Sequence, residues 1–252
     1  MKDWDINIYR GVLTGYNDAF IISTEKRDEI LANCADEAER TRTAELIRPI
    51  LRGRDIKRYG YDWANLWLIY IPWHFPYQFD NSITGASEKA EKAFKEQYPA
   101  VYNHMLQYKE PLSKRNKAET GIRYEWYAMQ RWGSKYWEDF KQPKIIYREI
   151  GFEMDACIVP ANWFVNNKLY LVTGNYIEYL LAFLNSKAFN KIILASANLT
   201  GGKGVGFMER VNVPLNQNLM KAVMATTDEE QIDALFNDFF GLTEEEKYFL
   251  SN

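Results

Sequence analysis

Short apolar runs rich in β-branched and aromatic residues recur along the chain and predict strands. The predicted strands are Val12–Ile22, Leu66–Ile71, Lys144–Ile150, Ala156–Val159, Leu169–Thr173 and Val211–Leu215. Apolar residues at spacings of three and four predict a helix over Asn175–Asn190, and two more helices are predicted at Ser87–Tyr98 and Val101–Tyr108, separated by Pro99. Because strands and helices mix without regular alternation, the pattern predicts an α+β fold, with a mixed sheet of short strands and flanking helices.

Residues 226–252 form a separate unit of pattern. The sequence from Thr227 to Glu230 is a capping box ahead of an apolar stripe that Gly241 can end, and Thr243 starts a second short helix. We therefore expect a main body over residues 1–225 and a small C-terminal helical pair over residues 226–252, packed on the same domain.

Charge is distributed unevenly along the chain. The formal net charge is −3, but residues 226–252 hold eight acids against one lysine. The rest of the chain is therefore basic, and its positive charge is concentrated in residues 42–58 and 109–148. A basic face that binds nucleic acid is compatible with this pattern, and so is ordinary solvated surface charge.

No apolar stretch is long enough to span a bilayer, and the first residues carry acids where a signal peptide needs positive charge. We therefore expect a cytoplasmic protein with no membrane partner. Cys34 and Cys157 lie far apart, with no spacing typical of a disulfide framework or a zinc site.

Tests for catalytic motifs fail. A nucleotide-binding P-loop has the pattern GxxxxGK followed by Ser or Thr. In "GGKGVG" (201–206), the lysine comes before Gly204 and no Ser or Thr follows it, so the segment is not a P-loop. The two histidines, His74 and His104, form no metal-binding pair or triad with a convincing partner. We therefore assign no catalytic residue, metal or cofactor to this chain.

Several phrases become informative when they are taken together. "GVLTGYNDAFII" (11–22) holds a polar turn, "LIRPILRGRDIKRY" (46–59) places four bases around a glycine, and "PKIIYREI" (143–150) is a strand ending in Tyr-Arg. A helical phrase (179–193) and the glycine loop follow, and "VNVPLN" (211–216) closes the series, ahead of "GLTEEEKYFL" near the end.

In this order, the phrases resemble the TaqI-like C-terminal specificity (target-recognition) domain of adenine-N6 DNA methyltransferases and related type IIG restriction-modification enzymes, over roughly residues 9–250. The resemblance implies a domain that reads double-stranded DNA beside an N-terminal or separate methyltransferase domain, with or without a nuclease, so that an adenine can be flipped and methylated. The catalytic motifs of that family are missing from this chain, which contains no Pro-Pro pair. S-adenosylmethionine is thus implied only for the missing catalytic domain.

The resemblance and the chemistry of DNA readout together nominate contact residues. Arginine can bridge guanine O6 and N7, asparagine can pair with adenine, and lysine mainly contacts phosphate. The expected DNA contacts are Thr14, Tyr16, Asn17, Arg52, Arg54, Lys57, Arg58, Tyr147, Arg148 and Lys203. For each of them a purely structural role remains open: Tyr16 can be packed, and Arg54 can pair with Asp55.

Residues 114–131 interleave bases with aromatics, which suits a nucleic-acid surface and a core edge equally. An aromatic-rich carbohydrate or small-ligand module is the second hypothesis for the whole chain, because Trp63, Trp67, Trp73 and Tyr77 can form stacking platforms. A domain that serves only assembly, docking through its acidic C-terminal pair, is the third.

Overall fold

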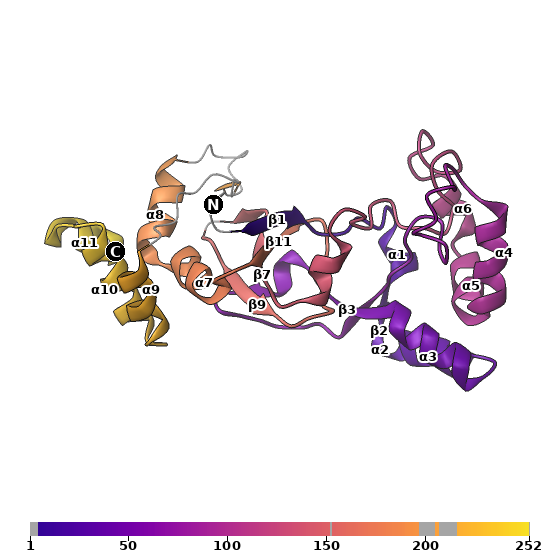
Figure 1. Ribbon diagram of the computed structural model, residues 1–252, viewed down its shortest axis with the longest axis horizontal. Helices are drawn as coiled ribbons and strands as arrows, with labels where there is room; N and C mark the ends of the chain where they lie inside the picture. The colour runs from indigo at the N-terminus through magenta and orange to yellow at the C-terminus, as the bar shows by residue number, and fades with distance from the viewer. Residues whose placement is uncertain (1–4, 152, 197–204, 207–215, 252) are drawn as a thin grey trace.

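The computed structural model describes residues 5–151, 153–196, 205–206 and 216–251. The described part of the chain forms an elongated molecule with its largest sheet near the middle (Figure 1). One end holds the C-terminal helices, and the other holds the helices of the N-terminal half of the chain (Figure 1). No helix in these ranges is long and apolar enough to cross a bilayer.

The central sheet is antiparallel and has the strand order β1-β11-β7-β9. Its strands are β1 (Ile6–Arg10), β11 (Leu169–Gly174), β7 (Lys144–Arg148) and β9 (Ala156–Val159). A second sheet has the order β10-β3-β6-β2, in which only the β10–β3 pair is parallel. Its strands are β10 (Phe164–Val165), β3 (Ile47–Leu51), β6 (Leu66–Ile69) and β2 (Ile21–Ser23). Two further pairs are short: β4 (Ile56–Lys57) with β5 (Gly60–Tyr61), and β8 (Ile150–Gly151) with β12 (Val205–Gly206).

Helices flank these sheets at both ends of the molecule (Figure 1). Those of the N-terminal half are α1 (Asn17–Phe20), α2 (Thr24–Ala32), α3 (Glu37–Leu46), α4 (Glu88–Gln97), α5 (Pro99–Leu106) and α6 (Lys109–Ser113). Those that follow the central sheet are α7 (Ile177–Asn185), α8 (Lys187–Ser196), α9 (Gln217–Met224), α10 (Glu229–Phe239) and α11 (Glu244–Ser251). Two 3₁₀ turns, η2 (Gly53–Asp55) and η3 (Trp137–Lys141), complete the set, and the predicted α+β class is confirmed.

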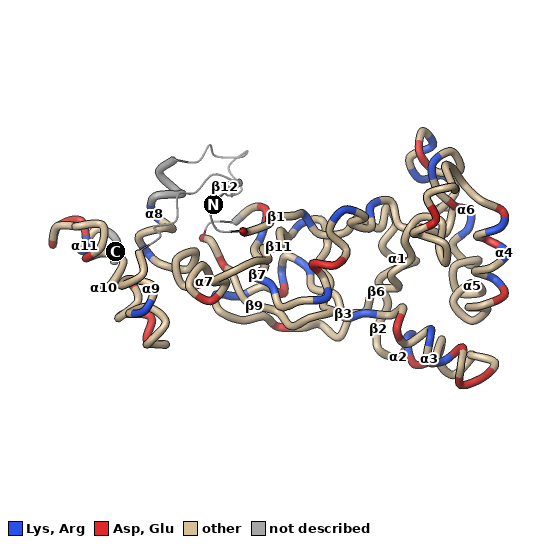
Figure 2. Tube along the Cα trace, viewed as in Figure 1, with Lys and Arg blue, Asp and Glu red and all other residues tan. Residues whose placement is uncertain are grey.

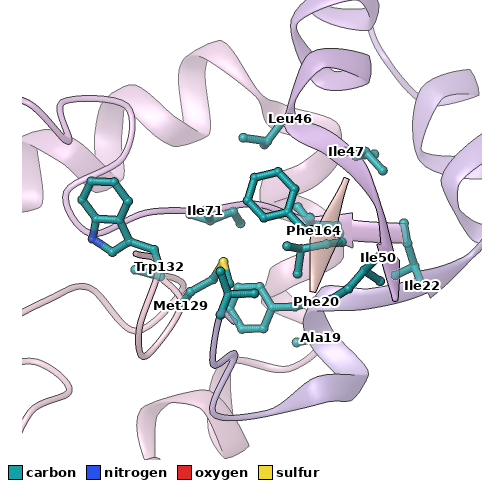
Figure 3. Close-up of a cluster of buried hydrophobic side chains, with 14 of the residues drawn as sticks. Ala19, Phe20, Ile22, Leu46, Ile47, Ile50, Ile71, Met129, Trp132 and Phe164 are labelled. Atoms are coloured by element: carbon teal, nitrogen blue, oxygen red, sulfur yellow. The ribbon is translucent and has the colours of Figure 1, made fainter. Parts of the chain in front are cut away.

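The central sheet separates two hydrophobic cores. Successive residues of a strand point to opposite faces: on β7, Ile146 joins the larger core, whereas Ile145 and Tyr147 join the smaller one. The larger core gathers side chains from α1, β2, β3, β10 and the loop that carries Met129 and Trp132 (Figure 3). The smaller core lies between the sheet and the C-terminal helices, since it includes Phe236 of α10.

The predicted strand Val12–Ile22 is wrong as a single element. Val12 and Leu13 form only isolated bridges, α1 interrupts the run, and β2 begins at Ile21. The interruption lies at the polar turn, where Gly15 adopts a φ of 78°, a conformation that favours glycine and that no strand contains.

The predicted helix Asn175–Asn190 is two helices, because Ser186 breaks it. Ser186 has extended backbone angles, and its Oγ accepts a hydrogen bond from Phe189 N at 3.2 Å, so it caps the start of α8. Asp233 Oδ1 also accepts a hydrogen bond from Lys187 N at 2.9 Å. Serine and a distant aspartate thus satisfy donors that a continuous helix would have paired internally.

The other helix predictions are confirmed with small shifts. Ser87 Oγ caps α4 by accepting a hydrogen bond from Ala90 N, and α5 begins at Pro99 itself rather than at Val101. Asp228, one residue beyond the predicted Thr227, caps α10. Thr243 caps α11 as predicted, through reciprocal bonds with Glu246. The predicted strand Val211–Leu215 lies outside the described residues.

Buried carboxylates join loops that are remote in sequence. Glu39 on α3 accepts hydrogen bonds from Ala35 N at 2.7 Å and from Ala100 N at 2.9 Å, which fixes α3 to the start of α5. Glu125 accepts hydrogen bonds from His74 N (2.8 Å), His74 Nδ1 (3.0 Å) and Ser87 N (3.0 Å). Both carboxylates are 2% exposed, so their bonds are not replaced by water.

Replacement of this second carboxylate should be strongly destabilising. We expect Glu125→Ala to lower the free energy of unfolding by about 3 kcal/mol, because two backbone N–H groups and a histidine ring lose their buried acceptor. Urea unfolding followed by circular dichroism measures the change. Glu138→Ala is the matched control: its carboxylate is 63% exposed and pairs with Lys141, so the expected loss is under about 0.5 kcal/mol. An equal loss of unfolding free energy in the two variants would contradict the role of Glu125 in joining these loops.

Candidate nucleic-acid interface

The polar turn that interrupts the first apolar run presents one exposed amide. Thr14 is buried, and its Oγ1 donates a hydrogen bond to Asn17 Oδ1 at 2.7 Å. This bond holds the amide oxygen of the exposed Asn17 side chain, so the NH₂ group is the donor that Asn17 can offer to a ligand. Tyr16 is half-buried and contacts the ring of Tyr108 with 6.2 Å between ring centroids. Of the three predicted residues here, Asn17 is thus the one placed to reach a ligand.

Arg115 holds this turn from beneath. Arg115 is 7% exposed, and its guanidinium donates hydrogen bonds to the backbone carbonyls of Thr14 (2.5 Å), Trp126 (2.7 Å), Ala128 (2.7 Å) and Leu112 (3.1 Å). Burial lowers the pKa of Arg115 to about 10, which leaves it charged at neutral pH. The turn is therefore tied by one side chain to the end of α6 and to the loop after residue 125.

The basic phrase around Gly53 divides its arginines between two roles. Arg52 forms a double hydrogen bond with Asp55, at 3.1 Å from Nε and 2.9 Å from Nη2, and the Asp55 side chain is 4% exposed. Arg52, rather than Arg54, is therefore the internal partner of Asp55. Arg54 is exposed and has no hydrogen bond or ion pair with any other residue that the structure describes.

Three more of the predicted cations have acidic partners. Lys57 lies 3.5 Å from Asp62 in an exposed pair. Arg58 Nη2 lies 3.0 Å from Glu229 Oε2 of α10. Arg148 pairs with Asp155 and also donates to Ile56 O.

The two remaining predicted residues are placed differently. Tyr147 is 5% exposed and stacks on Tyr170 with 5.4 Å between ring centroids, so its ring fills the smaller core. Lys203, in the glycine loop, lies outside the described residues.

The predicted residues form two groups rather than one. Hydrogen bonds from Tyr59 N to Ala156 O and from Arg148 to Ile56 O hold the β4–β5 hairpin against the central sheet, so Lys57, Arg58 and Arg148 gather there. The Thr14–Asn17 turn lies at α1, farther along the long axis (Figure 1). Lys and Arg positions occur near β7 and β9 and also between β1 and α1 (Figure 2).

The aromatic residues proposed as ligand platforms are engaged in packing. The indole N–H groups of Trp63, Trp67 and Trp73 donate to Leu66 O, Thr24 Oγ1 and Met129 O, respectively. Trp63 and Trp67 also contact each other edge to face, and Trp73 stacks on Tyr124. The three indole donors are therefore paired within the chain and each ring packs on another aromatic ring, so the structure does not favour a sugar-binding platform here.

The segment that interleaves bases with aromatics is both a core edge and a surface. Arg115, Trp126 and Tyr127 are buried, whereas Arg123 and Arg131 are exposed. The sequence pattern identified the segment but did not indicate which of its basic residues is buried. In the part of the chain that the structure describes, no group of three His, Cys, Asp or Glu residues is placed to hold a metal ion.

Comparisons with known proteins give one family and two similar solved structures. The TaqI-like C-terminal specificity domain matches residues 48–203. The fold is similar to that of the type IIL restriction-modification enzyme MmeI, solved in complex with DNA, with a TM-score of 0.56 and 12% identity. That match covers 94% of this chain and 33% of MmeI, so the chain spans about a third of that enzyme. The type IIG restriction endonuclease BpuSI matches at a TM-score of 0.40 and 12% identity, over 92% of this chain and 25% of that enzyme. A search of the curated proteins returns no match.

The four hydrogen bonds that Arg115 donates lead to a prediction about stability. We expect Arg115→Lys to lower the free energy of unfolding by about 2 kcal/mol, because an ammonium cannot serve four carbonyls arranged for a planar fork. Urea unfolding measures the loss, and Arg123→Lys, at a side chain that is 63% exposed, is the control with no change beyond about 0.5 kcal/mol. An unchanged free energy of unfolding for Arg115→Lys would contradict the stabilising role of these four hydrogen bonds.

Proposed function

The chain belongs to the TaqI-like C-terminal specificity domain family, and from this premise we propose that it reads a DNA sequence for a restriction-modification enzyme. The family match over residues 48–203 is the observation that carries the proposal. The domain binds double-stranded DNA and positions it, while a catalytic domain outside this chain carries out the chemistry.

The geometry supports a division between base contacts and phosphate contacts. Asn17 presents an oriented amide, which suits the edge of adenine, from a turn fixed by Thr14 and Arg115. Arg54 presents an uncompensated charge beside a glycine, which suits a phosphate. Lys57, Arg58 and Arg148 add to the positive electrostatic potential near the β4–β5 hairpin, although the charge of each is partly offset by its acidic partner.

We propose that the partner is an adenine-N6 methyltransferase domain, fused or separate, with or without a nuclease. That domain would hold S-adenosylmethionine and accept an adenine flipped out of the duplex. The reading domain contributes orientation: it fixes which base lies opposite the catalytic pocket. A DNA substrate also places the domain in the compartment that holds DNA, which we propose to be the cytoplasm.

Binding should be electrostatic and should depend partly on Arg54. We expect the 252-residue chain to bind duplex DNA with an affinity that falls steeply between 50 and 200 mM salt, because neutralised phosphates release counterions. Arg54→Ala should weaken binding to all duplexes similarly and reduce the slope of log affinity against log salt by about 1. Fluorescence anisotropy over a salt series measures both quantities.

Lys92→Ala serves as the control, because Lys92 is 77% exposed, pairs with Glu96 and lies on α4 at the far end of the molecule (Figure 1). Its salt slope should equal that of the unchanged chain. No affinity for any duplex at low salt, alone or joined to a methyltransferase domain, would refute the proposed function. An unchanged slope for Arg54→Ala would remove only the role of Arg54.

A further inference from the structure

Arg131 is a cation that is not among the expected DNA contacts. Its backbone is fixed beside the Thr14–Asn17 turn. Arg131 N donates to Leu13 O and Leu13 N donates to Arg131 O, both at 2.9 Å, which forms an antiparallel bridge. Gln130 N also donates to Thr14 O at 3.4 Å. The segment 130–131 therefore lies directly alongside the residues that lead into the turn.

Close packing makes this segment and the turn one unit. Gly15, with its φ of 78°, leaves room for Gln130: a Cβ at residue 15 would lie 2.9 Å from Gln130 Oε1 and 3.0 Å from Arg115 Cδ. The same Arg115 that donates to Thr14 O also donates to Ala128 O, two residues before Gln130. Both strands of the bridge are thus held by one buried guanidinium.

The side chain of Arg131 is available to a ligand. It is exposed and has no hydrogen bond or ion pair with another residue in the described ranges. By contrast, Arg52, Arg58 and Arg148 are each neutralised by an internal acid. A charge left unpaired on a rigid backbone suits a contact that demands fixed geometry, since the fork of an arginine loses little freedom when it binds.

We propose that Arg131 is a specificity-determining residue that reads the O6 and N7 edge of a guanine, on the same DNA surface that Asn17 addresses. This inference depends on the proposed function. Bridge partners have Cα atoms within about 5.5 Å, and the four steps from Leu13 to Asn17 span at most about 14 Å. The two backbones therefore lie within about 20 Å, which is the length of about six base-pair steps at 3.4 Å per step, so both side chains can contact one short DNA site.

The test uses a pool of duplexes with a randomised segment, selected by binding to the chain and sequenced. The unchanged chain should enrich one motif that contains a guanine. Arg131→Lys should flatten the preference for that guanine by about 10-fold or more and keep the preferences at the other positions, because lysine keeps the charge but loses the bidentate fork. Arg123→Ala, at an exposed cation that pairs with Glu119, is the control and should reproduce the original motif.

Each other outcome counts against the inference. If Arg131→Lys selects the original motif with unchanged preferences, Arg131 does not read a base. If Arg131→Ala weakens binding to all duplexes equally and Arg131→Lys retains the original affinity, Arg131 contacts a phosphate rather than a base. A chain that binds duplexes but shows no base preference that depends on Arg131 leaves the proposed function intact, whereas a chain that binds no duplex, alone or joined to a methyltransferase domain, refutes the function and this inference together.

Discussion

The buried guanidinium of Arg115 provides the interaction on which the Thr14–Asn17 turn depends. Four backbone carbonyls and no carboxylate surround it, so its charge is solvated by peptide dipoles from four separate positions in the chain. Such a cation is costly to bury and more costly to leave unsatisfied, which makes the surrounding loops move together or not at all. A turn without its own regular secondary structure thereby acquires the rigidity that base readout requires.

The second constraint is the internal neutralisation of basic side chains. Arg52, Arg58 and Arg148 pair with acids of the same chain, and burial of Asp55 makes the first of these pairs structural. Arg54 and Arg131 are exposed cations with no acidic partner among the described residues, so their charge is less offset within the chain than that of the paired arginines. On the proposed function, a second domain on the other side of the duplex would raise the overall affinity, because both domains would bind the same DNA at once.

The sequence predicted what local chemistry determines. The helix starts at Ser87 and Thr243 were predicted because the bonds that fix them are made within one turn, and Ala156–Val159 was predicted as a strand because its apolar run is short and complete. The break at Ser186 escaped prediction because Asp233, remote in sequence, stabilises it. In the same way, a pattern of alternating bases and aromatics cannot separate Arg115 from Arg131, since only tertiary contacts decide which of the two is buried.

The acidic C-terminal helices, which the sequence sets apart as a unit of pattern, share the smaller core with the central sheet. Ile232 and Phe236 lie in the smaller core with Tyr147 of the central sheet, and each contributes about 1.5–3 kcal/mol by burial. Glu229 of the same helix pairs with Arg58 on the β4–β5 hairpin. Removal of residues 226–252 would therefore expose the underside of the strand that carries Arg148. Any loss of DNA binding after such a truncation would report a disturbed sheet rather than a lost contact.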